Sequence, residues 1–233
     1  MKYLLCHYMK ECYRNNWIAP VDGNISFKHK NSDFFYITPA SLRKQEINND
    51  DIVKINISYQ KPAKLLADSV YPFISLDQDS NRQPSGELPL HTRFMLSPHL
   101  QNRDICIVHC HPPHILAYIG LMNYNRELKS ILTLFPELSI RIGNNVPYIT
   151  AKTEDLGERT YANMLVDQSN FCESDQETPP HKFYQIVALK QHGIVCMEDN
   201  FQKVMEIIET LEYYCRIALL ENAAMKFNTI THL

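Results

Sequence analysis

Two histidines two positions apart stand at the end of the segment that most strongly predicts a buried strand. The run at 104–111 reads DICIVHCH and predicts a buried strand, because apolar and β-branched residues dominate it. Side chains alternate across a strand, so His109 and His111 should project from one face and Cys110 from the other. Two imidazoles on one rigid edge can hold a divalent metal ion, and a third nitrogen would complete an open catalytic geometry. His192, at a predicted turn between two strands, is the best third candidate.

The same spacing has a plainer interpretation. A histidine at the end of a strand is more often a hydrogen-bonded core or surface residue than a metal ligand. The chain contains ten histidines, so one pair with this spacing can arise by chance. His114, three residues after the pair, could compete as a ligand or hydrogen-bond to one. Spacing alone therefore leaves both interpretations open.

Glu87 ends the segment PSGE (84–87) and stands at the predicted start of a helix over 87–96. A carboxylate at this position is commonly a helix-start residue, because the free backbone N–H groups there attract negative charge. The functional alternative makes Glu87 a general acid/base or a labile metal ligand beside the imidazoles. His91, one helical turn further on, faces the same side and is expected to be structural or to support the site.

Small residues stand next to these candidates. Gly23 and Asn24 open the first predicted strand, and Ser85 and Gly86 precede the acid. Backbones of this kind can cradle phosphate oxygens. The dipeptide at 22–23 is equally a plain turn signal, so a phosphate site needs support from elsewhere in the chain.

Hydrophobic spacing predicts the elements that must position these side chains. An apolar stripe over 2–14 indicates an amphipathic helix, and two short runs separated by polar residues indicate a β-hairpin. Alternating helices and strands after a hairpin imply a mixed α/β domain. The expected elements are strands at 24–29, 33–37, 51–57 and 104–111, helices at 87–96, after Pro112–Pro113 through Met122, 154–165 and 200–224, two strands within 183–197, a surface loop over 58–86 and a polar connector over 168–182.

Composition narrows the class of protein. The 233 residues, 45% of them hydrophobic, can bury a full core, and residues 1–233 are expected to form a single domain. A net charge of −3 without a basic stripe argues against a nucleic-acid partner. The seven cysteines are scattered and form no CxxC pair, which is typical of reduced cytosolic thiols. No signal peptide and no membrane span are expected, so the prediction is a cytoplasmic protein.

Six ordered segments of the sequence resemble the class II aldolase/adducin family, and together they cover nearly the whole chain. This resemblance implies a single α/β/α domain with a mixed, largely antiparallel central sheet covered by helices. It also implies a four-fold homotetramer with sites at the subunit interfaces. The segments are GNIS (23–26), YITPAS (36–41), PSGELPLH (84–91), IVHCH (107–111), PY followed by TEDL (147–156) and KQHGIV (190–195).

The resemblance assigns roles residue by residue. It places one zinc ion per chain on three histidines, and it makes Glu87 the catalytic acid. The chain departs from the family at Ala40 and Ser41, where members have Thr-Gly or Ser-Gly after Thr-Pro, and at Ala151 and Lys152, where they have an aromatic residue and a glycine. The implied zinc ligands are His109, His111 and His192, and the implied phosphate-binding residues are Gly23, Asn24, Ser41, Ser85 and Gly86.

The activity implied by the resemblance is zinc-dependent retro-aldol cleavage of a ketose phosphate to dihydroxyacetone phosphate and an aldehyde. Two other reactions use the same kind of site, namely 4-epimerisation of a sugar phosphate and dehydration of a methylthioribulose-type phosphate. Epimerases of the family carry aspartate where this chain has Glu87. A scaffold of the adducin type is the alternative from another class, but such heads lack the metal histidines that this chain retains.

Overall fold

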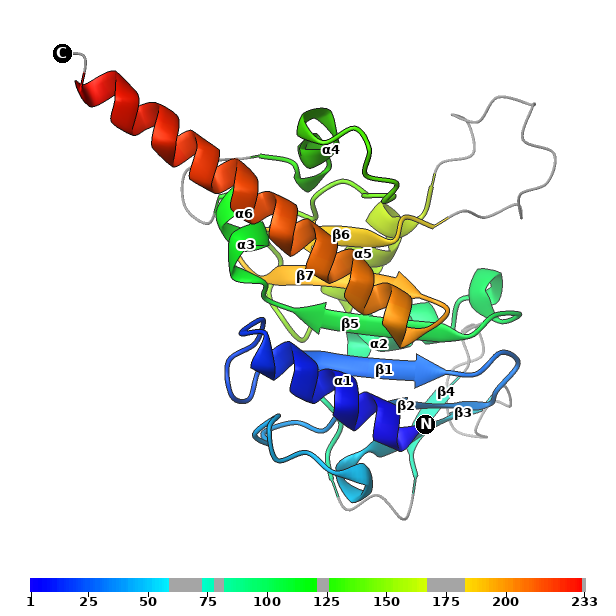
Figure 1. Ribbon diagram of the computed structural model, residues 1–233. Coiled ribbons are helices and arrows are strands. Elements are labelled where there is room, and N and C mark those ends of the chain that lie inside the picture. Colours follow the sequence, from blue (N-terminus) through cyan, green and yellow to red (C-terminus); the bar gives the residue numbers. More distant parts are fainter. Residues whose placement is uncertain (59–72, 78–81, 121–125, 167–182, 232–233) are drawn as a thin grey trace.

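The computed structural model of the protein describes residues 1–58, 73–77, 82–120, 126–166 and 183–231 (Figure 1). Its helices are α1 (Lys2–Arg14), α2 (Leu88–Met95), α3 (Pro113–Ile119), α4 (Ile131–Leu134), α5 (Glu154–Met164) and α6 (Phe201–Thr231). Its strands are β1 (Asn24–Lys28), β2 (Phe34–Ile37), β3 (Val53–Ser58), β4 (Phe73–Leu76), β5 (Ile105–Cys110), β6 (Ile186–Leu189) and β7 (Gly193–Glu198). Three short 3-10 turns are η1 (Asn49–Asp51), η2 (Pro98–Leu100) and η3 (Leu128–Ser130).

The strands form one seven-stranded sheet in the order β4-β3-β2-β1-β5-β7-β6, with every neighbouring pair antiparallel. Two isolated parallel bridges, Ile142 with Ile186 and Val146 with Leu189, add a mixed character at the β6 edge. The predicted α/β fold with a largely antiparallel sheet is therefore confirmed. The predicted hairpin is β1 paired with β2, in which Ser26 lies opposite Ile37.

Helices cover both faces of the sheet and bury two separate apolar cores (Figure 1). Helices α1, α3 and α6 pack on one face, and α2 and α5 pack on the other. The central strand β5 supplies both cores by alternation: Cys106, Val108 and Cys110 point to the first face, whereas Ile105 and Ile107 point to the second. His109 continues the second series and therefore faces the layer of α2.

Two expectations need correction. The stretch 58–86 is not loop throughout, because Phe73–Leu76 forms β4, a short edge strand that pairs only with β3. Four residues within a polar stretch give too short an alternation to mark a strand. The last helix runs to Thr231 rather than 224, because no proline or glycine follows residue 224 to end it. The connector predicted at 168–182 lies outside the described residues.

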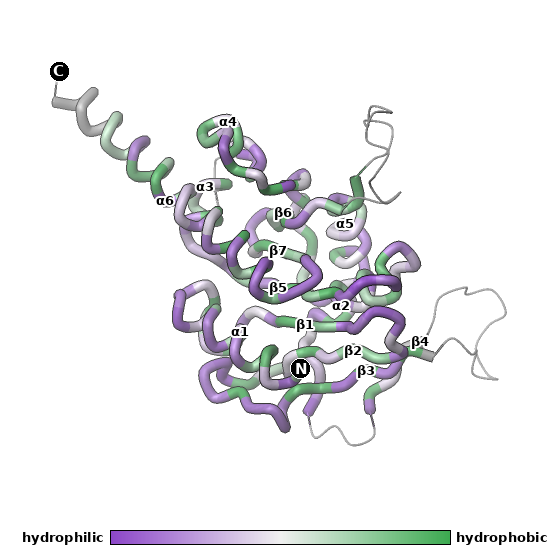
Figure 2. Tube along the Cα trace, turned by 45° about the vertical axis from the view of Figure 1, so that its right-hand side comes forward, coloured by the Kyte–Doolittle hydropathy of each residue, from purple (hydrophilic) through white to green (hydrophobic). Residues whose placement is uncertain are grey.

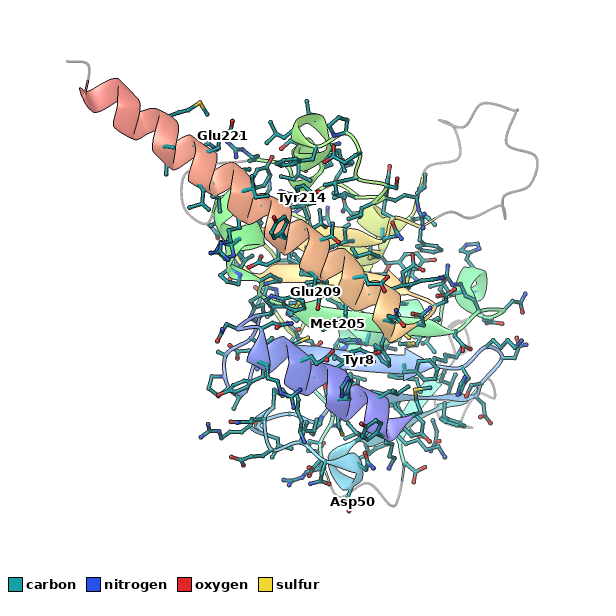
Figure 3. The ribbon with its side chains drawn as sticks, in the orientation of Figure 1. Tyr8, Asp50, Met205, Glu209, Tyr214 and Glu221 are labelled. Carbon is teal, nitrogen blue, oxygen red and sulfur yellow. The ribbon has the colours of Figure 1, made fainter. Side chains whose placement is uncertain are left out.

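Helix α6 leaves the body of the molecule before it ends. One apolar face of the helix is buried as far as Ala218, but Leu220 is 61% exposed and Met225 is 54% exposed. Figure 2 shows apolar and polar residues alternating along the projecting part. Tyr214, labelled in Figure 3, packs against Phe135 with ring centroids 4.6 Å apart and ring planes tilted by 55°, and this contact joins the helix to the end of α4. None of the described helices is long and apolar enough to span a bilayer.

Ile107, at the centre of β5, should carry much of the stability of the core beneath α2. Its side chain is fully buried, so Ile107→Ala is expected to lower the free energy of unfolding by about 2–5 kcal/mol. The control Leu220→Ala removes a mostly exposed side chain and should change it by less than about 0.5 kcal/mol. Urea unfolding followed by circular dichroism measures both values. Equal losses in the two variants would contradict the assignment of Ile107 to the core.

Candidate metal centre

Three histidines converge where β5 ends and β7 begins. His109 lies in β5, His111 directly follows it, and His192 precedes β7 in the turn from β6. Because β5 and β7 are antiparallel neighbours, with Cys110 opposite Ile194, the end of one strand meets the start of the other. One ligand atom from each imidazole lies within 4.8 Å of the other two. The fold thus brings together the three histidines that the sequence suggested.

Gly193 makes room for this convergence. A Cβ atom at this position would lie 2.5 Å from Cδ2 of His111, 2.6 Å from the carbonyl oxygen of Cys110 and 3.0 Å from Cε1 of His109. Real Cβ contacts of this kind do not occur, so any side chain would displace an imidazole or the strand. The position of Gly193 directly after His192 in the sequence is the signal that could have indicated this packing role.

The remaining predicted competitor lies elsewhere. His114 Nδ1 is 2.7 Å from Oε1 of Glu212 on α6, and it stands in the first turn of α3. The backbone N–H groups of His114 and Ile115 also donate to the same carboxylate, at 3.0 and 2.9 Å. Glu212 therefore holds the start of α3, and both lie on the face of the sheet opposite to that of His109. His114 has no place in the three-histidine group.

The protonation state of His109 follows from its partners. Its Nδ1 lies 2.9 Å from the carbonyl oxygen of Ile194, which can only accept, so Nδ1 carries the hydrogen. Burial lowers the pKa of His109 and lowers the pKa of His111 to about 3, so both rings are neutral at ordinary pH. The Nε2 atom of His109 then has a free lone pair, and this form of the ring binds a metal ion.

Further nitrogen and oxygen atoms that can bind a metal ion lie around this lone pair. His109 Nε2 is 3.2 Å from Nε2 of His111 and 3.1 Å from Oε2 of Glu87. His192 Nε2 is 3.1 Å from the other oxygen of that carboxylate. Ligands about 2.1 Å from a tetrahedral zinc ion lie roughly 3.4 Å apart, which is close to these separations. Nitrogens and carboxylate oxygens at such spacing suit a divalent cation between them.

Glu87 lies where the predicted helix begins, as the N-cap residue of α2, and is 6% exposed. Burial alone would raise the pKa of its carboxyl group. The nearby His109 ring and the hydrogen bonds from His192 and Asn24 outweigh burial and hold this pKa well below its usual range, so Glu87 is ionised.

The predicted phosphate residues lie on neighbouring segments. The turn at 38–41 meets the segment 83–86 through two backbone bonds, Ala40 N–H to the Gln83 oxygen and Ser85 N–H to the Thr38 oxygen, each 3.0 Å. Ser41 is exposed and has a φ of 54°, the left-handed conformation that favours glycine. The serine found in place of the family's glycine therefore adopts a glycine-like backbone.

Gly23 and Asn24 lie beside β5, the strand that carries His109. Gly23 has a φ of 68°, and a Cβ there would lie 2.5 Å from Cγ2 of Ile18, so the turn requires glycine. The Asn24 amide donates to Oε2 of Glu87 at 2.9 Å. An NH2 group carries two hydrogens, and this bond uses one. Phosphate binding by Asn24 stays a prediction.

Lys152, which stands where the family resemblance implies a glycine, lies beside the segment predicted to bind phosphate. The side chain of Lys152 lies across Gly86, where a Cβ atom would come within 2.9 Å of Cδ and 3.0 Å of Cε. Its φ of 67° is again left-handed. An exposed ammonium group is therefore held beside the segment predicted to bind phosphate.

The architecture and the donor set define a class: an α/β/α protein whose central antiparallel sheet carries three converging histidines, a candidate metal site, beside a buried carboxylate. The sequence pattern of the Class II Aldolase and Adducin N-terminal domain matches residues 4–219, and the chain belongs to this family. The family is typically metal-dependent and acts on sugar phosphates. The resemblance proposed from six segments is confirmed.

Individual relatives are distant. Methylthioribulose-1-phosphate dehydratase of Saccharomyces cerevisiae (strain YJM789) is 22% identical over 229 residues, which covers 93% of this chain and 82% of the relative. 5-deoxy-D-ribulose 1-phosphate aldolase of Bacillus thuringiensis serovar kurstaki is 21% identical over 211 residues, which covers 90% and 80%.

Solved structures share the fold. An L-fuculose 1-phosphate aldolase superposes with a TM-score of 0.65 at 19% identity, covering 95% of this chain and 86% of that one. A sugar-phosphate aldolase from Thermotoga maritima gives 0.66 at 16% identity, covering 96% and 95%. At these identities the superpositions establish the architecture alone.

The purified protein is expected to carry one divalent metal ion per chain, bound by the three histidines. His109→Ala or His192→Ala should abolish binding, because each removes one of only three nitrogen ligands. His29→Ala, which changes an exposed histidine after β1, should leave the metal content unchanged. Elemental analysis after dialysis measures the ratio of metal to protein. Full metal content in His109→Ala would refute the site.

Proposed function

We propose that this protein is a zinc-dependent aldehyde-lyase that cleaves a ketose phosphate to dihydroxyacetone phosphate and an aldehyde. The observation that carries the proposal is the Glu87 carboxylate, whose two oxygens lie 3.1 Å from Nε2 of His109 and of His192. A proton-transfer group and a metal site thus share one small volume. Zinc in this site would polarise the substrate carbonyl and stabilise the enediolate left when the carbon–carbon bond breaks.

Glu87 is suited to move the proton of this reaction. A base removes the proton from the substrate hydroxyl, the carbon–carbon bond breaks to give the aldehyde, and the electron pair remains as the enediolate. Protonation of the enediolate carbon then gives dihydroxyacetone phosphate, so the proton taken is returned. Glu87 is ionised and buried, and its position at the start of α2 fixes its direction.

The phosphate group would bind beside Glu87, at the residues that directly precede it in the sequence. Ser85 and Gly86 precede the acid, and Ser41 is on the adjoining turn. Hydroxyl and backbone N–H groups supply neutral donors, and Lys152 beside Gly86 supplies a positive charge. Gly23 and Asn24 complete the proposed set at the start of β1.

Dehydration of a methylthioribulose-type phosphate is the second candidate. Relatives named methylthioribulose-1-phosphate dehydratase, including the one from Saccharomyces cerevisiae, favour it over 4-epimerisation. The relative named 5-deoxy-D-ribulose 1-phosphate aldolase favours cleavage, whereas the retained glutamate suits cleavage and dehydration equally. A non-catalytic scaffold of the adducin type would have no use for three converging histidines and a buried acid.

The proposal includes a cytoplasmic homotetramer with active sites at the subunit interfaces. Its support is the family resemblance, in which four-fold assembly is usual. The small-molecule substrate is the proposed partner, and no nucleic-acid or membrane partner is proposed, in keeping with a net charge of −3. Light scattering of the purified protein measures the assembly directly.

The reaction can be tested with a panel of ketose 1-phosphates and the zinc-loaded protein. Cleavage should release dihydroxyacetone phosphate and an aldehyde, which mass spectrometry and a coupled reductase assay detect separately. A product lighter by one water identifies dehydration instead, and a product of unchanged mass that differs in retention identifies epimerisation. Either result would overturn the aldolase assignment while retaining the metal site.

Glu87→Gln should separate metal binding from catalysis. The three histidines remain, so zinc content should stay at the wild-type level, whereas kcat should fall by about 10²–10⁴-fold because the amide cannot accept the proton. Glu154→Gln, an exposed change at the start of α5, is the matched control and should retain the rate. Wild-type turnover in Glu87→Gln would show that another group moves the proton.

A further inference from the structure

A chain of buried polar side chains runs from Glu87 into the layer between the sheet and α2. Asn24 donates through Nδ2 to Oε2 of Glu87 at 2.9 Å. The other end of the amide, Oδ1, is hydrogen-bonded to Nε2 of His91, and Nδ1 of His91 is hydrogen-bonded to Oγ of Ser26. All four residues are buried, and the side chains of His91 and Ser26 are inaccessible to solvent.

Local structure explains why these side chains meet. Asn24 and Ser26 are two apart in β1, so both project from the face of the sheet that carries His109, which lies directly opposite Asn24. His91 is one turn after Glu87 in α2, on the side of the helix that packs on this face. The acid and the imidazole therefore contact the same amide from the same helix.

Only one arrangement of hydrogens satisfies every bond in the chain. The Glu87 carboxylate accepts, so Asn24 presents its NH2 group to it and turns its carbonyl oxygen to His91. That oxygen can only accept, so Nε2 of His91 carries the hydrogen. Burial lowers the pKa of His91 to about 3, which keeps the ring neutral and leaves Nδ1 to accept from the Ser26 hydroxyl. Each member thus fixes the orientation of the next.

We propose that His91 is a positioning residue that acts through Asn24 to hold the Glu87 carboxylate between His109 and His192. Without the His91 donor, the Asn24 amide is free to turn, and the reversed amide would set an oxygen against the carboxylate. Glu87 would then lose a hydrogen bond and one fixed direction, while the histidines would remain in place. The inference deepens the proposed function, since it rests on Glu87 as the group that moves the proton.

The kinetic test compares variants of the full-length, zinc-loaded protein. His91→Leu should lower kcat about 10- to 100-fold while zinc content stays at the wild-type level, and Asn24→Ala should lower it to a similar extent. The double variant should be no slower than Asn24→Ala, because both changes remove the same support. His91→Gln, whose amide N–H can donate in place of the imidazole, should recover part of the loss.

Two serines provide a matched control. Ser26→Ala removes the hydroxyl that directs His91, and kcat should fall about 3- to 10-fold. Ser97→Ala removes an equally buried hydroxyl that bonds Tyr161 at the end of α2, away from the acid, and kcat should be unchanged. A purely structural role for His91 would instead give independent, multiplying losses in the double variant and equal effects of the two serines. Either result overturns the proposal.

A crystal structure of zinc-loaded His91→Leu tests the inference without turnover. The Asn24 side chain should leave Glu87, with the three histidines unmoved. If the wild-type protein cleaves no ketose phosphate but Asn24 turns in this variant, the aldolase proposal fails and the positioning role stands. If Asn24 stays on Glu87 in the variant, the positioning role is refuted whatever the activity of the wild-type protein.

Discussion

The arrangement of the site depends on the contact between the unprotonated Nε2 of His109 and the Glu87 carboxylate. Two groups that can only accept lie 3.1 Å apart in a buried place, and such a pair is unfavourable unless a cation joins them. Three features of the fold bring these two groups and His192 together. The β5–β7 register brings in His192, Gly193 leaves space for the rings, and the start of α2 aims the acid.

Sequence patterns predicted the parts of the site that depend on local geometry. Alternation along 104–111 was enough to place His109 on one face and Cys110 on the other, because a strand repeats every two residues. His192 required the family pattern, since its approach depends on a strand pairing across some 80 residues. The hydrogen bonds of His91 and the position of Lys152 over Gly86 were not predictable, because they depend on distances between separate elements.

Two positions at which this chain departs from the family pattern have a left-handed backbone. Ser41 and Lys152 stand where that pattern has glycine, and their φ angles are 54° and 67°. Left-handed conformations at residues with side chains cost of order 1 kcal/mol each. Both residues lie beside the segment 83–86, and each has a left-handed backbone without the glycine that favours it.

The hydrogen bonds of Glu212 to α3 have a consequence for ion selection. The Glu212 carboxylate accepts from the first turn of α3, which begins two residues after His111. The chain after β5 is thus held on the face of the sheet opposite to that of His109. Ligands held in this way lose little conformational entropy when an ion arrives. Three imidazole donors held in this way would favour a transition-metal ion over calcium and magnesium, which prefer oxygen ligands.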